Sequence, residues 1–553
     1  MTQSSGDTGG RLDRHGGDLA RAVFANHSID TMWTLSGAHV FPIYDAAVRA
    51  EPAMRIIDVR HEQTAVFGAE ATGKLTRTPG LAVLTAGPGV TNGVSAIAQA
   101  YFGGVPLLVV GGRAPGYRWG TGALQELDHP PVLTTITKHA VTARSTAQVA
   151  ATLDSAAHIA ETPHRGPVFV DVPMDELFGR SDAEVPAAQP GEVIEPDPAE
   201  LTRVGNLIAA AQRPVLVLGS DVWLDAAEDA AARFAAETGV PVVANGMGRG
   251  ILPRGHPLLV GRARSTAFQQ ADLVIVAGTP LDFRLGYGAF PGGAAVVHLA
   301  DSPGQLASHV QLAGAVAGDL TAVFDGLLAA WAAAPARRSD PDWADGLRAS
   351  AAAAAERDVA LLTVDSEPIH PARIYGELLP MLADDAVVIG DGGDFVSWAG
   401  KFVEPARPGC WLDPGPFGCL GAGTGAAAAA RLARPSSQVV LLYGDGAAGM
   451  SLMDVDTLVR HGLPAVLIVG NNGAWGLEKH PMRFLYGYDV ATDLRRETRY
   501  DAIVEALGGA GETVSRPDQI GPALRRAFAA DVPYLVNVLC DPEVAYPRST
   551  TGV

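Results

Sequence analysis

Residues 439–446 read Val-Val-Leu-Leu-Tyr-Gly-Asp-Gly, and residues 465–472 read Ala-Val-Leu-Ile-Val-Gly-Asn-Asn. Each stretch is a short apolar run that is closed by glycine, which is the pattern of a buried parallel strand. Between them we expect a helix over residues 451–461. The carboxyl ends of the two strands then lie together, at the edge where open α/β sheets bind ligands.

These two strand ends carry a set of oxygen ligands. Asp445 offers a carboxylate, Asn472 an amide oxygen and Ala474 a backbone carbonyl, and such hard oxygens suit Mg²⁺. Gly444 and Gly446 let the backbone turn sharply and approach a ligand closely. Alone, Gly-Asp-Gly is ordinary punctuation at a strand end. Paired with Asn-Asn one helix and one strand later, it predicts a site for a metal ion and a diphosphate.

Composition sets limits on the class of protein. The chain has 553 residues, is 48% hydrophobic and 18% charged, and has a formal net charge of -19. The negative charge disfavours nucleic acid or an anionic membrane as a partner, because phosphates would be repelled. No apolar run approaches the roughly 20 residues that span a bilayer, and the N-terminus does not resemble a signal peptide. Cys410, Cys419 and Cys540 lack metal or disulfide spacing. We expect a cytoplasmic protein.

Strand and helix patterns alternate along the chain, with glycines at the turns. This predicts an α/β fold of three doubly wound parallel-sheet domains. The expected divisions are a flexible tail at 1–15, a first domain at 16–185, a linker at 181–200, a central domain at 200–332, a linker at 333–370, a third domain at 371–540 and a C-terminal tail at 541–553. Strands are expected at 31–35, 56–59, 81–85, 107–110, 214–218, 241–243, 273–276, 296–299 and 387–389.

Two phrases of the first domain carry a family resemblance. Asp58-Val-Arg-His-Glu62 and Thr85-Ala-Gly-Pro-Gly-Val-Thr-Asn92 resemble the pyrimidine-binding domain of the acetolactate synthase superfamily, whose members use thiamine diphosphate. The resemblance implies thiamine diphosphate and Mg²⁺ as cofactors, with Asp445, Asn472 and the Ala474 carbonyl as metal ligands. It also implies that Glu62 is the catalytic carboxylate facing the cofactor's aminopyrimidine, with Pro88 and Asn92 beside it. In isolation, Glu62 also fits a surface glutamate at a helix start.

The third domain and part of the second extend the resemblance. Gly390-Asp-Gly-Gly-Asp-Phe-Val396, Trp411-Leu-Asp-Pro-Gly-Pro-Phe-Gly418 and Gly278-Thr-Pro-Leu-Asp-Phe-Arg-Leu-Gly-Tyr-Gly288 are similar to the acetolactate synthase-like branch assigned as 2-hydroxyacyl-CoA lyase. Leu420 matches the residue that wedges between the cofactor's two rings, and its position within the phrase favours this role over that of a core leucine after a turn. The implied cofactor-binding residues here are Gly392, Gly393, Asp394, Gly418, Leu420, Gly444, Asp445, Gly446, Ala447, Asn472, Trp475 and Gly476.

Substrate contacts are implied less firmly. His39 and Gln125 resemble residues that face the substrate in benzaldehyde lyase, but either fits a polar loop residue with satisfied hydrogen bonds. Glu478 and His480 follow the metal site and could transfer protons, or they could belong to an exposed helix start. The catalytic residues implied are Glu62, His39, Gln125 and Glu478.

The central domain bears on a nucleotide or CoA. Gly248-Arg-Gly-Ile-Leu-Pro253 and Gly261-Arg-Ala-Arg-Ser265 resemble oxalyl-CoA decarboxylase and 2-hydroxyacyl-CoA lyases, in which this domain carries ADP. In acetolactate synthases it carries FAD. Thr279-Pro280 and Ala300 depart from these patterns, so ADP, FAD or an empty domain all stay open. The implied CoA contacts are Arg264, Ser265, Lys401 and Arg548, although Arg264 also fits a solvated surface arginine. The C-terminal tail could form a lid.

The resemblance predicts a thiamine-diphosphate-dependent carbon-carbon lyase. Its expected reaction is reversible cleavage of a 2-hydroxyacyl-CoA to formyl-CoA and an aldehyde or ketone. The alternative is an acetolactate synthase or benzaldehyde-lyase-type enzyme acting on pyruvate or free aldehydes. A non-catalytic relative is disfavoured by Glu62 together with Asp445 and Asn472. The resemblance also implies at least a homodimer and favours a homotetramer. The substrate is expected to be a small molecule, an acyl-CoA.

Overall fold

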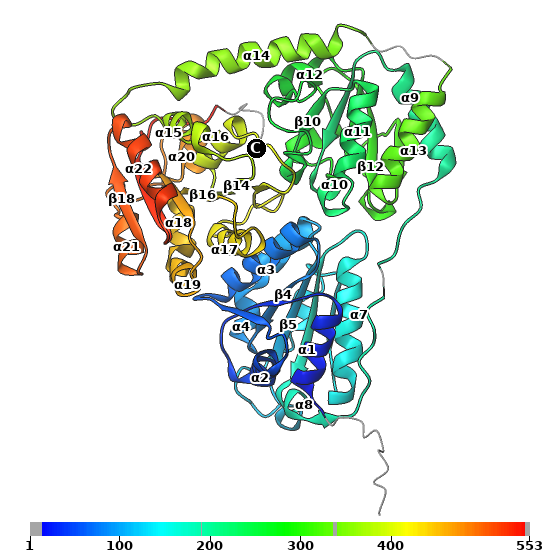
Figure 1. Cartoon of the computed structure of the whole chain (residues 1–553), viewed down its shortest axis with the longest axis vertical. Helices are drawn as coiled ribbons and strands as arrows, with labels where there is room; N and C mark the ends of the chain where they lie inside the picture. Colours follow the sequence, from blue (N-terminus) through cyan, green and yellow to red (C-terminus); the bar gives the residue numbers. More distant parts are fainter. Residues whose placement is uncertain (1–13, 190, 336–339, 548–553) are drawn as a thin grey trace, which may run out of the picture.

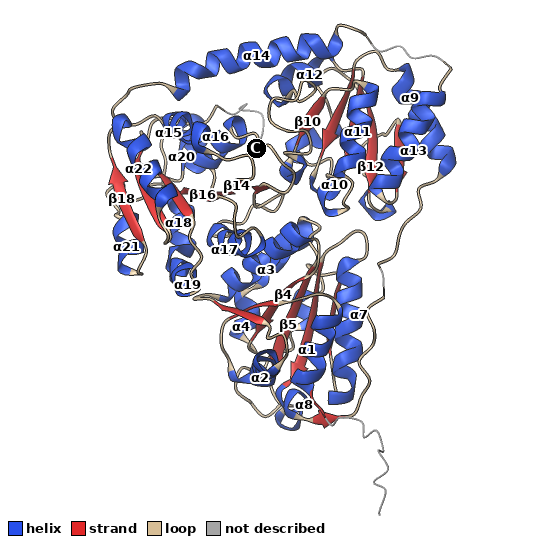
Figure 2. Cartoon of the chain, in the orientation of Figure 1, coloured by secondary structure: helices blue, strands red, loops and turns tan. Residues whose placement is uncertain are grey.

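The computed structural model describes residues 14–189, 191–335 and 340–547. Within them, three parallel sheets flanked by helices form three domains in chain order (Figures 1 and 2). In Figure 1 the N-terminal domain lies at one end of the molecule, and the central and C-terminal domains lie beside each other at the other end. The predicted fold class is therefore confirmed.

The N-terminal domain contains six parallel strands in the order β3-β2-β4-β5-β7-β6. β4 is apolar and fully buried, as expected for a strand with helices on both sides. The strands are β2 Thr31–Thr34, β3 Arg55–Asp58, β4 Gly80–Leu84, β5 Leu107–Arg113, β6 His139–Thr142 and β7 Pro167–Pro173. The helices are α1 Gly16–Asn26, α2 Phe41–Arg49, α3 Glu62–Thr76, α4 Pro88–Asn92, α5 Val94–Phe102, α6 Pro130–Leu133, α7 Val149–Glu161 and α8 Met174–Phe178.

Two residues expected in the flexible tail are part of this domain. Arg14–His15 form strand β1, which pairs in antiparallel fashion with β8 (Arg180–Ser181). His15 also caps α1, because its Nδ1 accepts the N–H of Asp18 at 3.1 Å. The rest of the expected tail, residues 1–13, lies outside the described residues.

The central domain has five parallel strands in the order β10-β9-β11-β12-β13. The strands are β9 Pro214–Leu218, β10 Val242–Ala244, β11 Leu273–Ala277, β12 Ala295–Ala300 and β13 Gly314–Ala317. The helices are α9 Pro198–Ala210, α10 Ser220–Leu224, α11 Glu228–Thr238, α12 Arg264–Gln270 and α13 Leu320–Ala333.

The segment expected as the second linker contains one long helix. α14 (Trp343–Leu362) has 20 residues. It passes above both the central and the C-terminal domain in Figure 1. The helix is anchored at its start, where the buried Trp343 donates its indole N–H to the carbonyl of Pro214 at 2.9 Å.

The C-terminal domain has six parallel strands in the order β15-β14-β16-β17-β19-β18. β16 and β17 are neighbours, as the opening motif predicts. The strands are β14 Val387–Asp391, β15 Trp411–Leu412, β16 Val439–Gly444, β17 Val466–Asn471, β18 Ala510–Val514 and β19 Tyr534–Leu539. The helices are α15 Pro371–Leu378, α16 Asp394–Phe402, α17 Gly423–Ala433, α18 Asp445–Ser451, α19 Val455–Arg460, α20 Gly476–Tyr486, α21 Tyr500–Ala506 and α22 Pro517–Ala529.

The helix predicted over residues 451–461 was placed wrongly at its start. Helix α18 begins at Asp445 itself, since Gly444 has the extended ψ of 151° that is typical of an N-cap. A short 3-10 turn follows, and α19 completes the crossover. Asp445 therefore lies at the first position of a helix and not in a loop before one.

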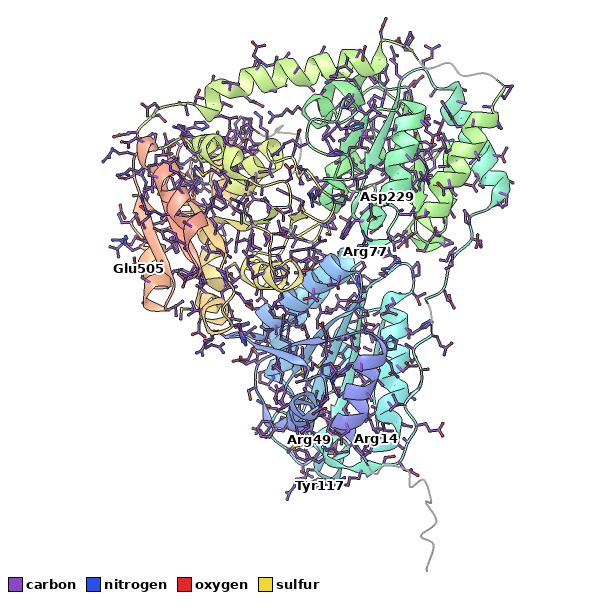
Figure 3. All side chains as sticks on the ribbon, in the orientation of Figure 1. Arg14, Arg49, Arg77, Tyr117, Asp229 and Glu505 are labelled. Atoms are coloured by element: carbon purple, nitrogen blue, oxygen red, sulfur yellow. The ribbon has the colours of Figure 1, made fainter. Side chains whose placement is uncertain are left out.

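Helices α3 and α17 join the N-terminal and C-terminal domains (Figure 1). They approach closely because Gly425 has no side chain: a Cβ there would lie 2.9 Å from the backbone nitrogen of Gly68. Asp454 adds a hydrogen bond from Thr64 Oγ1 at 2.6 Å. Arg77, labelled in Figure 3 at the end of α3, reaches the central domain and donates to Glu228 Oε1 at 2.5 Å.

No helix in the described part of the chain is long and apolar enough to cross a bilayer.

Candidate active site

A cavity of about 470 Å³ opens at the carboxyl ends of β14, β16 and β17. Its size falls in the range of small-molecule sites, which run from about 300 to 1,000 Å³. His480 is not among its described lining residues, but the predicted cofactor and metal residues of the C-terminal domain and the proton-transfer candidate Glu478 all line it. They are Gly392, Gly393, Asp394, Gly418, Leu420, Gly444, Asp445, Gly446, Ala447, Asn472, Ala474, Trp475, Gly476 and Glu478.

Asp445 lies at the base of this cavity and is 3% exposed. Its Oδ1 accepts the N–H of Gly446 at 3.0 Å, and its Oδ2 accepts the N–H of Gly473 at 2.7 Å. Burial raises the pKa of Asp445 to about 6, and these backbone donors only partly oppose the effect. A divalent cation would supply the positive charge that an ionised carboxylate lacks there.

The neighbouring oxygens fit the same cation. Asn472 follows β17, and its Oδ1 accepts the N–H of Ala474 at 3.1 Å, which orients the amide. Carboxylate, amide and carbonyl oxygens are ligands that Mg²⁺ prefers, and Mg²⁺ commonly shares them with substrate phosphates. The residues present therefore fit a magnesium ion that carries a diphosphate.

Two of the glycines that line the cavity leave no room for a side chain. A Cβ on Gly446 would lie 2.4 Å from the ring of Trp475. Gly392 has φ +136°, and a Cβ on it would lie 2.8 Å from the backbone nitrogen of Gly444. Backbone atoms therefore form this wall, as a closely bound phosphate group requires.

The second group of predicted residues meets in the N-terminal domain. Glu62 is 6% exposed at the start of α3, and its Oε2 accepts from Asn92 Nδ2 at 2.9 Å. Pro88 begins α4 in the adjacent turn, and a Cβ on Gly89 would lie 3.8 Å from Glu62 Oε1. Among the described residues, none of this group lines the cavity at Asp445 in the same chain.

The two predicted substrate residues lie around this turn. His39 is buried, its Nδ1 lies 3.1 Å from Thr85 Oγ1, and burial lowers its pKa, which favours the neutral ring. Gln125 has φ +60°, and a Cβ on Gly87 would lie 3.0 Å from its Cβ. His39 therefore has a hydrogen-bond partner, as a polar loop residue would, yet both residues lie against the Gly87 turn.

His480 and Tyr546 lie near the cavity at Asp445 in sequence or through Asp394, but neither is among its described lining residues. His480 on α20 has a buried Nε2 without a hydrogen-bond partner in the described structure. The N–H of Tyr546 donates to Asp394 Oδ1 at 2.9 Å, and the Tyr546 ring packs edge-on against Trp398. Residues 541–547 of the predicted lid thus rest on the C-terminal domain. Arg548 lies outside the described residues.

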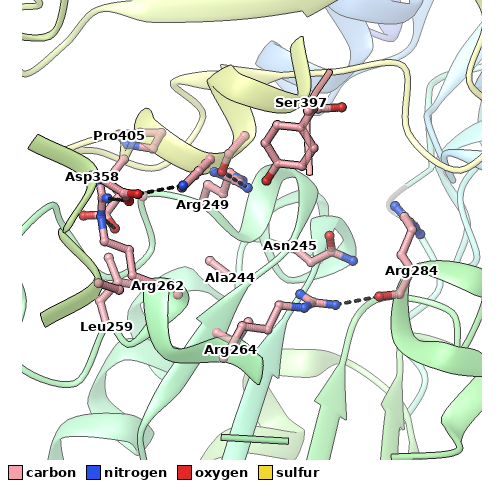
Figure 4. Close-up of a pocket in the computed structure, with 18 of the residues that line it drawn as sticks. Ala244, Asn245, Arg249, Leu259, Arg262, Arg264, Arg284, Asp358, Ser397 and Pro405 are labelled. Atoms are coloured by element: carbon pink, nitrogen blue, oxygen red, sulfur yellow. Dashed lines mark hydrogen bonds and ion pairs between the residues drawn. The ribbon is translucent and has the colours of Figure 1, made fainter. Parts of the chain in front are cut away.

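A second and larger cavity, of about 790 Å³, lies between the central and C-terminal domains below α14 (Figure 4). Arg264 and Lys401, predicted to meet CoA, line it, whereas Ser265 is not among the described lining residues. The cavity has a surplus of basic side chains. They are Arg249, Arg262, Arg264, Arg284, Arg357 and Lys401, against Asp358 and Glu404.

The basic side chains of this second cavity differ in how they are paired. Asp358 of α14 binds both Arg262 and Lys401, at 2.7 Å each. Arg264 donates to the backbone carbonyl of Arg284, and burial, with the charges of Arg249 and Arg284, lowers its pKa to about 10. The buried Nδ2 of Asn245 has no hydrogen-bond partner in the described structure. Arg264 and Asn245 are therefore available to an anionic ligand.

Three functional candidates were missed by sequence reasoning. Arg249 lines both cavities, and Arg284 lines the second. Both lie inside the motifs at 248–253 and 278–288 that carry the family resemblance, and Arg249 is the one charged residue of its motif, which was a usable signal. Asp358 lies in an alanine-rich helix and gave no such signal.

Comparisons with known proteins agree with this geometry. Three family models match the chain: the N-terminal thiamine pyrophosphate binding domain at residues 14–132, the central domain of such enzymes at 201–327 and the C-terminal thiamine pyrophosphate binding domain at 391–538. An acetolactate synthase large subunit of Mycobacterium tuberculosis is 47% identical, covering 98% of this chain and 99% of that one.

A second group of relatives is more distant. The 2-hydroxyacyl-CoA lyase 2 of Caenorhabditis elegans is 34% identical over 95% of this chain and 89% of its own length. The human protein of that name is also 34% identical, over 95% and 90% respectively. These relatives and the three matched domains confirm the predicted resemblance. The chain belongs to the family of thiamine-diphosphate-dependent enzymes that includes acetolactate synthases and 2-hydroxyacyl-CoA lyases.

Proposed function

We propose that the protein is a carbon-carbon bond-forming enzyme of the acetolactate synthase type, which joins two 2-keto acids, or a 2-keto acid and an aldehyde, with loss of CO₂. The cavity at Asp445, with its carboxylate, amide and carbonyl oxygens, carries the proposal. The identity of 47% to an acetolactate synthase supports this substrate class over the CoA thioester that the sequence motifs first suggested.

The C-terminal cavity would hold the cofactor's diphosphate. Asp445, Asn472 and the carbonyl of Ala474 would bind Mg²⁺, which in turn binds phosphate oxygens. Backbone along 444–447, where α18 begins, would meet the remaining phosphate charge. Leu420 lines the same cavity and would pack between the cofactor's rings.

Glu62 would bind the other end of the cofactor. Thiamine diphosphate, when bound, supplies an electron sink for the carbanion left when a bond beside a carbonyl carbon breaks. The carboxylate of Glu62 would hold a proton at the ring nitrogen of the aminopyrimidine, while Asn92 fixes the orientation of that carboxylate. The neutral His39 could then donate a hydrogen bond to the carbonyl oxygen of a substrate.

A complete site would need two copies of the chain. Glu62 and its neighbours are outside the described lining of the Asp445 cavity, so one chain supplies the two halves of the site in separate places. Pairing the N-terminal half of one subunit with the C-terminal half of another would join them, and two-fold symmetry would give two sites. We therefore propose a homodimer as the minimal active form; a tetramer stays a prediction.

A second candidate function is cleavage of 2-hydroxyacyl-CoA to formyl-CoA and a carbonyl compound. The second cavity favours it, because Arg249 lines both cavities and basic side chains surround the larger one. A CoA held there by its phosphates, at Arg264 and Asn245, could extend its thioester toward the first cavity. The same basic side chains would also suit ADP or FAD.

Product analysis separates the two candidates. The purified protein with Mg²⁺ and thiamine diphosphate is supplied with pyruvate or with 2-hydroxyisobutyryl-CoA, and products are identified by mass spectrometry. Acetolactate from pyruvate, lost in Asp445→Asn, supports the first candidate. Formyl-CoA and acetone from the thioester, with pyruvate untouched, would replace it with the second. If the protein forms neither acetolactate from pyruvate nor formyl-CoA from the thioester, both candidates are refuted.

A further inference from the structure

A buried histidine and aspartate lie beneath the turn that carries Pro88. His129 and Asp171 are both 0% exposed, and His129 Nδ1 lies 2.9 Å from Asp171 Oδ2. Gly87 donates its N–H to the other ring nitrogen, Nε2, also at 2.9 Å. Neither side chain belongs to the proposed cofactor or substrate contacts.

These bonds define the tautomer of His129. A ring nitrogen that accepts an N–H must carry a free lone pair, so Nε2 is unprotonated and the ring proton is on Nδ1, facing Asp171. Arg113 donates to the same oxygen of Asp171 at 2.8 Å and balances its charge. A buried charge with such partners is held in place, because removing either partner leaves the other unpaired. His129 therefore presents a fixed acceptor to the backbone of Gly87.

The turn fixed in this way carries Pro88 and adjoins three more predicted residues of the N-terminal half-site. Gly89 lies against Glu62, and Gln125 packs on Gly87. His39 is bonded to Thr85 at the start of the same turn. Gly87 has φ +58°, and its backbone is not part of a helix or strand. Its N–H therefore has no acceptor within regular secondary structure, and the hydrogen bond to His129 holds it in place.

We propose that His129, oriented by Asp171, is a positioning residue of the active site. It fixes the backbone of residues 86–89. Pro88 and Glu62 then keep their positions relative to the aminopyrimidine, and Gln125 and His39 keep theirs relative to the substrate. The inference rests on the proposed function, which assigns this turn to the cofactor.

Two substitutions of His129 separate positioning from general stability. In His129→Gln the side-chain oxygen can reach the former place of Nε2 and still accept from Gly87. In His129→Asn the shorter side chain can reach Asp171 but not Gly87. The matched control is His27→Asn, since His27 is a buried histidine of the same domain that lies 2.9 Å from Asp154 on α7. Thermal unfolding verifies that all three variants are folded.

The measurements are kcat and KM at saturating thiamine diphosphate, and hydrogen-deuterium exchange of the peptide spanning residues 84–92. Leaving the buried N–H of Gly87 unpaired in His129→Asn should lower kcat about 10- to 100-fold and speed exchange in that peptide. His129→Gln should stay within about threefold of wild type because the acceptor is retained. His27→Asn should change neither kcat nor exchange at 84–92, whatever it does to stability.

The inference is overturned if His129→Gln and His129→Asn lose kcat equally. It is also overturned if kcat and hydrogen exchange in His129→Asn equal those of the wild type. If the wild-type protein shows no turnover that depends on thiamine diphosphate, the proposed function fails on its own. Hydrogen exchange then decides the positioning role without an activity assay: slow exchange at 84–92 in His129→Asn would refute it.

Discussion

Replacing Gly446 with alanine tests whether the start of α18 forms a wall of the cofactor cavity. The added Cβ would lie 2.4 Å from the Trp475 ring. Packed carbon atoms stay about 3.5 Å apart, so the ring and the new methyl group would have to separate by about 1 Å. Trp475 lines the cavity next to Asn472. The substitution should therefore disturb the site directly.

The size of the effect follows from packing energies. Forcing an extra methyl group into a packed site costs about 1–3 kcal/mol. If the ring can relax only by moving into the cavity, that cost falls on the bound state and weakens thiamine diphosphate binding about 5- to 150-fold. Gly449 in the same helix is the control, because a Cβ there meets nothing within 4 Å. Gly449→Ala should leave the Kd unchanged and raise stability by roughly 0.5–1 kcal/mol.

Titration calorimetry with thiamine diphosphate in the presence of Mg²⁺ measures both Kd values, and thermal unfolding gives the stabilities. The reasoning is refuted if Gly446→Ala binds the cofactor as tightly as wild type while remaining folded. It is also refuted if Gly449→Ala weakens binding as much, since the helix and not the cavity wall would then be responsible.

Three further outcomes follow from the structure. Glu62→Gln should bind thiamine diphosphate within about tenfold of wild type yet lose at least about 100-fold in kcat, because the amide cannot take up a proton as the carboxylate does; stopped assays measure this. Asp358→Asn removes the carboxylate that binds both Arg262 and Lys401, and should tighten ADP or CoA binding about tenfold by calorimetry. Asp345→Asn, at an exposed ion pair of the same helix, should not change that binding. The Glu161 carboxylate, 3.7 Å from His27 Nδ1, and the Asp154 carboxylate raise the pKa of His27 above its usual 6.5. These contacts therefore stabilise the fold below pH 6.5, and the stabilisation is lost as pH rises through the higher folded pKa. The Tm of the wild type should fall over that window relative to the Tm of His27→Asn.

The fold was predictable because its strands are apolar runs closed by glycine. β9 occupies the predicted residues, and β16 and β17 pair as neighbours. The C-terminal half-site was equally predictable, since Asp445 and Asn472 are fixed by strand ends that a parallel sheet must bring together. The start of α18 was not, because the extended backbone of Gly444 lets the helix begin at Asp445 itself.

The remaining site residues depend on contacts between distant parts of the chain. His129 reaches Gly87 from 42 residues away, and nothing in the sequence around it marks an acceptor for a turn. Asp358 reaches Arg262 only because α14 extends through the expected linker and passes over the second cavity. Local patterns predict elements and their ends, whereas such pairings follow from how the domains pack.

That packing also decides how the two half-sites can combine. Thr64 and Gly68 of α3 are bound to the C-terminal domain of their own chain, so Glu62 at the start of α3 cannot swing toward Asp445 without breaking that contact. In a symmetric dimer each site then takes Glu62 from one subunit and Asp445 from the other. Mixing inactive Glu62→Gln chains with inactive Asp445→Asn chains should create heterodimers with one intact site. Random exchange at equal amounts would restore about a quarter of wild-type activity, since half of the dimers are mixed and each has one of two sites intact. Activity that stays at zero, although native mass spectrometry detects the heterodimer, would mean that both residues of a site come from one chain.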